Sequence, residues 1–166
     1  MFNRKRAKTS FLVVAVSFYL LLASVMAQAA TSLEVLDSYI AGWNSHDAAT
    51  CASHFDKEIV FYDATVGKPV SGPANVRKEI VESFMTAVPD LKLERENEVL
   101  VQDDSVIWKW SFSGTNTGDW SDGTKATNKR FKINGLTWMK IKDGKIVYSG
   151  DFYDAYGFYQ QLGLLE

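Results

Sequence analysis

Two aspartates stand where the sequence otherwise predicts β-strands. Asp151 lies inside KIVYSGDFY at 145–153, a run rich in β-forming residues, although aspartate is depleted in strands. Asp63 follows EIVFY at 58–62 and ends a second such run. Two carboxylates that share a pocket acquire different pKa values, which suits one of them to remove a proton and return it. We therefore take Asp151 and Asp63 as the candidate catalytic residues.

Each aspartate also has a purely structural interpretation. Asp151 can be a solvated carboxylate near a strand end, and Asp63 can start an Asx turn in the loop 64–70. Strand alternation places Asp151 and Tyr153 on one face, with Gly150 and Phe152 on the other. If the face of Asp151 looks into an apolar pocket, burial raises its pKa into the range useful for a base. The sequence leaves both interpretations open.

Neighbouring residues predict that such a pocket has an aromatic wall. Two tryptophans and a phenylalanine share one face of the strand 105–114, although such a stripe also suits a plain core. On the next strand, Gly135 and Thr137 share a face, and Gly135 leaves room for a ligand or a bulge. We expect a small hydrophobic or carbonyl-bearing ligand. The predicted substrate-binding residues are Trp43, Phe61, Trp108, Trp110, Phe112, Gly135, Thr137 and Tyr153.

The elements that must position these residues begin with three helices. Apolar residues recur at helical spacing from Leu33 to Trp43. Asp47 is a suitable N-cap for a second, short helix that runs through Phe55. The residues SGP at 71–73 open a third helix with proline in its first turn, and Pro89 ends it.

The apolar period then changes from helical spacing to alternation. After a strand at 58–64, we predict four more at 91–101, 105–114, 130–142 and 145–153, with residues 115–129 as a long exposed loop. This order predicts an α+β fold. The expected shape is a cone-shaped α+β barrel, in which three N-terminal helices pack on a strongly curved, mostly antiparallel sheet and leave one open mouth.

The first 29 residues have the order of a secretory signal peptide. Basic residues at 4–8 precede the apolar run FLVVAVSFYLLLASVM at 11–26, and AQA at 27–29 is a small-x-small cleavage site. We predict a signal peptide over 1–29, cleavage near Ala29, and one periplasmic or secreted domain over 30–166 that makes no stable membrane association. An uncleaved membrane anchor is the alternative.

Composition argues against several functional classes. The chain has 18 Lys and Arg against 20 Asp and Glu. Cleavage removes four basic residues and no acidic one, which leaves a formal charge of −6 and argues against nucleic acid as a partner. Cys51 is the one cysteine and there are two histidines, so we expect neither an intrachain disulfide nor a zinc site, and no metal or other cofactor.

Seven segments occur in an order that resembles a known family. They are YIAGWNSHD, VFYDA, VSGPANVRKEI, AVPDL, FSGTNTGDW, DGKIVYSGDFYD and QQLGLL. Together they resemble the SnoaL-like polyketide cyclases of the nuclear transport factor 2-like superfamily, over nearly the whole predicted domain. This superfamily contains cyclases, isomerases, epoxide hydrolases, dehydratases and non-enzymatic ligand binders, so the fold alone does not determine the function.

The resemblance implies a role for Asp151. In these cyclases an aspartate on the last strand is the general acid/base that forms an enolate for intramolecular aldol attack, and the match places it at Asp151. The family's pocket histidine falls at Thr137, and its Pro-Thr-Gly-Lys turn reads ATNK at 126–129. We expect an exported, cofactor-free cyclase or isomerase in which Tyr153, Thr137 or a water stabilises the enolate oxygen. The alternatives are a non-catalytic binder of a small hydrophobic ligand and an assembly module; the resemblance implies a homodimer.

Overall fold

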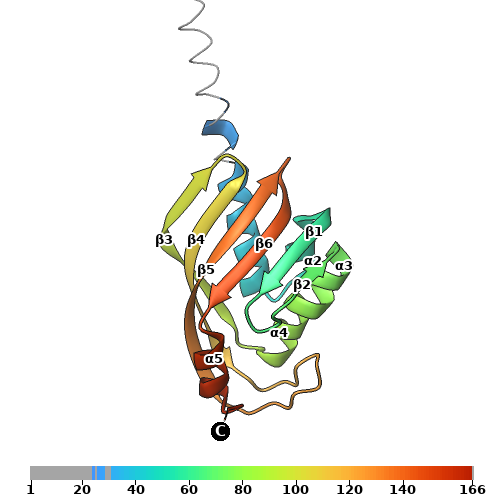
Figure 1. Ribbon diagram of the computed structural model, residues 1–166, viewed down its shortest axis with the longest axis vertical. Coiled ribbons are helices and arrows are strands. Elements are labelled where there is room, and N and C mark those ends of the chain that lie inside the picture. Colours follow the sequence, from blue (N-terminus) through green and yellow to red (C-terminus); the bar gives the residue numbers. More distant parts are fainter. Residues whose placement is uncertain (1–23, 25, 29–30, 166) are drawn as a thin grey trace, which may run out of the picture.

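The computed structural model describes residues 24, 26–28 and 31–165, which form helices packed against one six-stranded sheet (Figure 1). The strands are β1 (Phe55–Asp63), β2 (Pro69–Ser71), β3 (Lys92–Gln102), β4 (Ser105–Thr115), β5 (Arg130–Lys142) and β6 (Lys145–Tyr153). Their order in the sheet is β2-β1-β6-β5-β4-β3, and β1 and β6 are the parallel pair. The predicted α+β fold with a mostly antiparallel sheet is confirmed.

The described helical residues fall into several segments. Residues 31–44 are helical, and α2 (Ala48–Ser53) follows. The predicted third helix is a continuous run of α3 (Pro73–Val76), a π-helical segment η1 (Arg77–Glu82) and α4 (Ser83–Ala87). The chain ends with α5 (Ala155–Leu162). In the part of the chain that the structure describes, no helix is long and apolar enough to cross a membrane. Most of the predicted signal peptide lies outside the described residues.

The helix ends follow the local sequence signals. The Asp47 side chain accepts hydrogen bonds from the backbone N–H groups of Ala49 and Thr50, so the predicted N-cap of α2 is confirmed. This helix ends at Ser53 rather than Phe55, because Phe55 begins β1 and buries its ring in the core. Gly72 precedes Pro73 with a φ of 83°, a left-handed value that glycine adopts without steric cost.

The strand predictions hold best for the last four strands. Those strands agree with prediction within one residue at each end, but β1 begins at Phe55, three residues before the predicted start. The short edge strand β2 was not predicted, because Pro69 and the nearby Gly67 indicate a turn. Pro69 is tolerated because β2 lies at the edge of the sheet and pairs with β1 alone.

The segment 116–129 differs from the exposed loop that the sequence predicts. Asn116 is fully buried, and its side-chain amide donates to the carbonyl oxygens of Ala87 and Gly118. The Trp120 ring packs edge-on against Phe84 of α4, with 5.2 Å between ring centroids. The loop is therefore tied to α4 and closes one end of the core.

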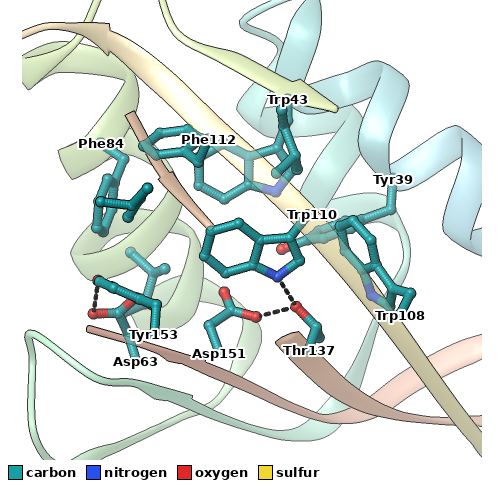
Figure 2. A pocket seen from close by; sticks show the side chains of 13 residues that line it. Tyr39, Trp43, Asp63, Phe84, Trp108, Trp110, Phe112, Thr137, Asp151 and Tyr153 are labelled. Atoms are coloured by element: carbon teal, nitrogen blue, oxygen red, sulfur yellow. Dashed lines mark hydrogen bonds between the residues drawn. The ribbon is translucent and has the colours of Figure 1, made fainter. Parts of the chain in front are cut away.

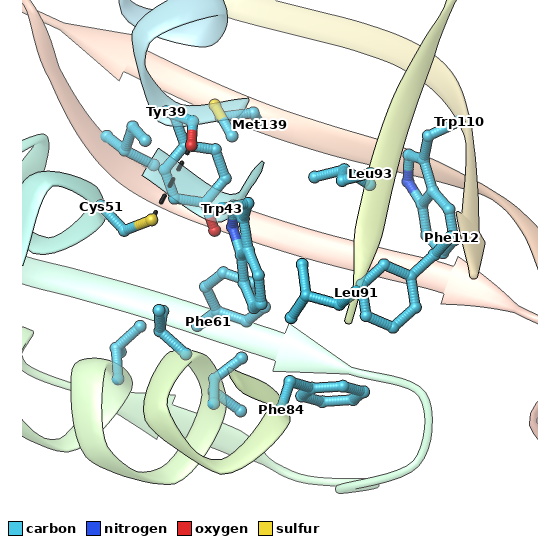
Figure 3. Close-up of a cluster of buried hydrophobic side chains, with 14 of the residues drawn as sticks. Tyr39, Trp43, Cys51, Phe61, Phe84, Leu91, Leu93, Trp110, Phe112 and Met139 are labelled. Atoms are coloured by element: carbon cyan, nitrogen blue, oxygen red, sulfur yellow. Dashed lines mark hydrogen bonds between the residues drawn. The ribbon is translucent and has the colours of Figure 1, made fainter. Parts of the chain in front are cut away.

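The core lies between the helices and the sheet (Figure 3). Tyr39 and Trp43 extend from the helical residues 31–44 toward the strands. Cys51 is free, fully buried and part of this core, as expected for a cysteine that acts as a small apolar residue. Many aromatic rings belong to this core, and a small cavity lies among them beside Asp151 and Tyr153 of β6.

Candidate functional site

The sheet register brings the two candidate aspartates side by side. Asp63 is opposite Asp151 in the parallel β1–β6 pair. Asp151 is opposite Thr137 of β5, and Thr137 is opposite Trp108 of β4. These four residues line the same cavity, and we call them the inner row. No local pattern predicts this adjacency, because β1 and β6 lie at opposite ends of the folded domain's sequence.

Asp151 lines the cavity and has a strongly perturbed acidity. Burial of the carboxyl group raises its pKa to about 7, and the negative charge of Asp63 adds to this effect. A hydrogen bond from the Thr137 hydroxyl, 2.6 Å from Asp151 Oδ1, acts in the opposite direction. At neutral pH the carboxyl group is therefore populated in both its protonated and its ionised forms, as a general acid/base requires.

Thr137 and Trp110 form a hydrogen-bonded chain that ends on Asp151 (Figure 2). The Trp110 indole N–H donates to Thr137 Oγ1 at 2.8 Å, which leaves the threonine proton for Asp151. Gly135 makes this chain possible, because a Cβ there would lie 2.3 Å from the Trp110 ring. The space that we expected Gly135 to leave for a ligand or a bulge is filled by that indole. Gly135 is not among the residues that line the cavity.

Asp63 combines the two roles that its sequence position allows. Its Oδ1 accepts hydrogen bonds from the backbone N–H groups of Thr65 and Val66, as an Asx turn requires. Its carboxylate also accepts from the Tyr153 hydroxyl, 3.0 and 3.1 Å from the two oxygens. Asp63 is only 3% exposed and lines the cavity. Burial and the neighbouring negative charge of Asp63 raise the pKa of Tyr153, so this hydroxyl stays protonated.

The cavity itself is small and largely aromatic. Its volume is about 40 Å³, which is room for about three water molecules. A ligand of drug size occupies a pocket of roughly 300–1,000 Å³, so such a ligand enters only if the aromatic wall moves. The lining residues are Tyr39, Trp43, Asp63, Ile80, Phe84, Leu93, Trp108, Trp110, Phe112, Ile133, Thr137, Asp151 and Tyr153.

Most residues that the sequence nominates come together in this lining. Trp43, Trp108, Trp110 and Phe112 form its wall, as expected. Phe61 does not line it, because this ring is fully buried in the core two residues before Asp63, under the helices (Figure 3).

The cavity also contains residues that sequence reasoning missed. Tyr39, Phe84 and Leu93 come from three different elements and were not nominated. Tyr39 had a usable signal, because it stands four residues before Trp43 on the same helical stripe. Within the described residues, no three His, Cys, Asp or Glu side chains group as metal ligands would.

Comparison with known proteins identifies relatives of the whole domain. The family described as SnoaL-like polyketide cyclase matches residues 33–162. One solved structure is that of AclR from Streptomyces galilaeus, which carries a provisional hydroxylase assignment. Its sequence is 25% identical to this chain, and the TM-score is 0.67. The match covers 86% of this chain and 99% of that one. The search of curated proteins finds no match.

Two further solved structures show the same architecture. A provisionally assigned polyketide cyclase from Bacillus cereus is 25% identical, covers 80% of each chain and has a TM-score of 0.61. A hypothetical protein from Catenulispora acidiphila, solved with trimethylamine, has a ketosteroid isomerase-like fold. Its sequence is 14% identical to this chain, the TM-score is 0.67, and the match covers 78% of this chain and 92% of that one. At this identity the similarity supports the fold alone.

Proposed function

This chain belongs to the SnoaL-like polyketide cyclase family, and we propose that it is a cofactor-free enzyme that moves a proton next to a carbonyl group. Asp151 is the general acid/base. One observation carries this proposal: Asp151 lines an apolar cavity beside a second carboxylate, and its pKa is raised to about 7. An aspartate with an ordinary pKa, about 3.9, is a weaker base at neutral pH.

The proposed step needs no redox partner. The Asp151 carboxylate takes the proton from the carbon next to a carbonyl, the C–H electron pair becomes a C=C bond, and the carbonyl π pair moves to oxygen. In a cyclase the enolate carbon then bonds to a second carbonyl carbon, whose oxygen takes the proton back from Asp151. In an isomerase the proton returns to a different carbon.

Asp63 supports this reaction without taking part in proton transfer. Its oxygens already accept hydrogen bonds from Thr65, Val66 and Tyr153. Its charge lies beside Asp151 in the sheet and helps to raise the pKa of that group. Asp63 is therefore a positioning residue that holds Tyr153 and tunes Asp151.

A second proposal concerns the opposite face of the sheet. One residue from each of five neighbouring strands lies opposite a residue of the next strand, and we call this set the outer row. From β1 to β3 across the sheet, its members are Tyr62, Gly150, Trp138, Ile107 and Leu100. Leu100 is 68% exposed, Phe152 beside this row 43% and Trp138 37%. Such an apolar band is typical of a protein contact surface.

A second copy of this chain is the occupant that charge favours. β3 has three exposed glutamates, Glu94, Glu96 and Glu98, against two exposed basic residues, Lys92 and Arg95, whereas exposed Arg130, Lys132 and Lys142 lie on β5, on the other side of β4. Two copies packed face to face about a twofold axis can set the acidic strand of one over the basic strand of the other. We propose a homodimer of this kind. We also propose that the protein is exported and cleaved near Ala29.

The proton-transfer proposal is tested with the smallest ketone, because the cavity is small. We expect the wild-type protein to exchange the methyl protons of acetone for deuterium in D₂O faster than buffer alone, measured by ¹H NMR. Asp151→Asn should lower this rate by about 100-fold to 10,000-fold, since it removes the base. Phe152→Leu changes the adjacent residue on the opposite face and should leave the rate unchanged.

The result also separates an enzyme from a ligand binder. One result would be a wild-type protein that binds acetone and exchanges no protons, although carboxyl-carbon NMR shows that Asp151 titrates near 7. That result would indicate a non-catalytic pocket. A titration of Asp151 near the model-peptide value of about 3.9 would remove the acid/base mechanism itself.

A further inference from the structure

The cavity beside Asp151 has a much larger neighbour. A hollow of about 510 Å³ is bounded by the helical run from η1 to α4, the segment 116–129 and α5, and we call it the side hollow. Among the described residues, Phe84 of α4 is the one that lines both the side hollow and the cavity of about 40 Å³. Figure 2 shows its ring at the end of the cavity away from Trp108. The two spaces therefore meet at Phe84.

The helical run from η1 to α4 forms the partition between the two spaces. Ile80 lines the cavity, Ser83 lines the side hollow, and the Phe84 ring lies at the boundary. This ring packs edge-on against Phe112 of the cavity wall, with 5.8 Å between ring centroids. It also packs against Trp120 of the side hollow, at 5.2 Å. An outward swing of the Phe84 ring would therefore join the two spaces.

Phe84 is the part of the cavity wall best placed to move. The other aromatic residues of the cavity do not line the side hollow, so within the described chain they lack this space behind them. Trp120, which backs Phe84, is half-buried, and its buried indole N–H has no hydrogen-bond partner in the described part of the chain. An unpartnered donor weakens the closed arrangement, because opening gives it water or a ligand oxygen. The neighbouring η1 is π-helical, a geometry frequent at functional sites.

The lining of the side hollow suits an apolar group without net charge. Two lysines, Lys68 and Lys78, and two acidic residues, Glu79 and Asp122, line it, so their formal charges cancel. Its volume lies within the range of roughly 300–1,000 Å³ that holds a drug-sized ligand. The apolar lining residues, which come from several segments, are Val66, Phe84, Trp120, Phe158, Leu162 and Leu164.

We propose that the side hollow is a second substrate subsite and that Phe84 sets the size of the substrate. This inference rests on the proton-transfer function proposed above. The carbonyl end of the substrate lies in the cavity against Asp151, and its apolar body lies in the side hollow. Phe84 swings aside so that the atoms connecting the two parts can pass. The substrate class is therefore a neutral ketone that is longer than the cavity.

The first test compares a short and a long methyl ketone. Acetone fits with the Phe84 ring in place, whereas 4-phenyl-2-butanone must displace it. In Phe84→Leu the ratio of kcat/KM for proton exchange, long ketone over acetone, should rise by about 10-fold or more, while the acetone value stays within about threefold. Phe55→Leu shortens a similarly buried side chain that lines neither space and should leave the ratio unchanged.

A second variant fills the side hollow and leaves the partition alone. Thr124 lines the side hollow and is half-buried. Thr124→Trp should lower kcat/KM for 4-phenyl-2-butanone by about 10-fold and leave acetone unchanged, because the new ring occupies the place of the phenyl group. Thr117→Trp makes the same change at an exposed residue of this segment that lines neither space, and should behave as wild type. This pair keeps the proposal testable if Phe84→Leu does not fold.

A third measurement detects the long ketone without requiring turnover. The indole N–H signal of Trp120 is assigned in a ¹H–¹⁵N spectrum by its loss in Trp120→Phe. We expect 4-phenyl-2-butanone to shift this signal and acetone at the same concentration to leave it in place. The shift reports on the side hollow, because Trp120 lines that space and not the cavity.

The outcomes separate this proposal from the proton-transfer function. A Trp120 signal that does not move in saturating 4-phenyl-2-butanone would overturn the second subsite and leave acetone exchange by Asp151 intact. An unchanged ratio in a folded Phe84→Leu variant would overturn the role of Phe84. A shifted Trp120 signal without exchange of either ketone would retain the subsite and remove the proton-transfer function.

Discussion

The inner and outer rows are made by neighbouring residues of the same strands, yet they have opposite characters. Asp63 and Asp151 are in the inner row, and Tyr62 and Gly150, one residue earlier in each strand, are in the outer row. The inner row faces the helices, and a hydrogen bond links two of its residues, Thr137 and Asp151. In the outer row, Leu100 and Trp138 are exposed. A step of one residue along a strand therefore decides whether a side chain faces the cavity or the open side of the sheet.

The difference has one physical cause. The helices of the described chain pack on the side of the sheet that Asp151 faces, so carboxylates on that side lose water and those on the open side keep it. Desolvation is the largest effect that raises the pKa of Asp151. The same strand sequence in a two-layer fold with the opposite register would have a solvated Asp151 and a buried Phe152.

The largest predicted effect is the dependence of stability on pH. Between about pH 4 and about pH 7 the folded protein holds a proton on Asp151 that the unfolded chain has released, because the folded pKa is raised to about 7. The free energy of unfolding should therefore fall as pH rises through this window, by up to about 4 kcal/mol, and change no further above it on account of this group.

Urea unfolding at several pH values checks this prediction. Asp151→Asn cannot ionise and should show a flatter profile across the same window. Asp143→Asn, in the exposed β5–β6 turn, should keep the wild-type slope. Equal slopes in all three proteins would mean that the inner row is as solvated as the outer face.

A matched pair of glycines gives the next largest effect. In Gly135→Ala the new Cβ would lie 2.3 Å from the ring of buried Trp110. We expect overpacking to lower the free energy of unfolding by about 1–3 kcal/mol and to break the hydrogen bond from Trp110 to Thr137. In Gly150→Ala the nearest atoms are the Tyr148 hydroxyl at 2.6 Å and the Phe152 ring at 2.9 Å.

Those two groups are the ends of side chains on the open face, so they can move aside. We expect Gly150→Ala to cost less than about 1 kcal/mol. Thermal and urea unfolding of the two variants measure the contrast directly. A greater loss in Gly150→Ala than in Gly135→Ala would reverse our view of which face is tightly packed.

The smallest effect on folding should come from the outer row itself. Leu100→Ser replaces an apolar side chain that is 68% exposed and should change the free energy of unfolding of the monomer by no more than about 0.5 kcal/mol. If the outer row joins two copies, the same variant should shift sedimentation from dimer toward monomer. A wild-type protein that sediments as a monomer at high concentration would rule the homodimer out.

Some of this structure follows directly from the sequence. Alternation places Asp151 and Tyr153 on one face, and both line the cavity. The side chain of Asp47 caps α2 as its residue type predicts. Such features depend on local backbone geometry and on side-chain bonds to residues two or three positions away, so a single sequence contains the information.

Other features were decided only by the tertiary structure. Asp63 and Asp151 are neighbours because the first and last long strands pair in parallel, and no local period records that register. Gly135 accommodates the indole of Trp110, a residue on another strand, and so its free space could not be assigned from its own strand. The raised pKa of Asp151 likewise requires the helices on one side of the sheet and Asp63 on the adjacent strand. Local propensity fixes which way a side chain points, whereas long-range packing fixes what it meets there.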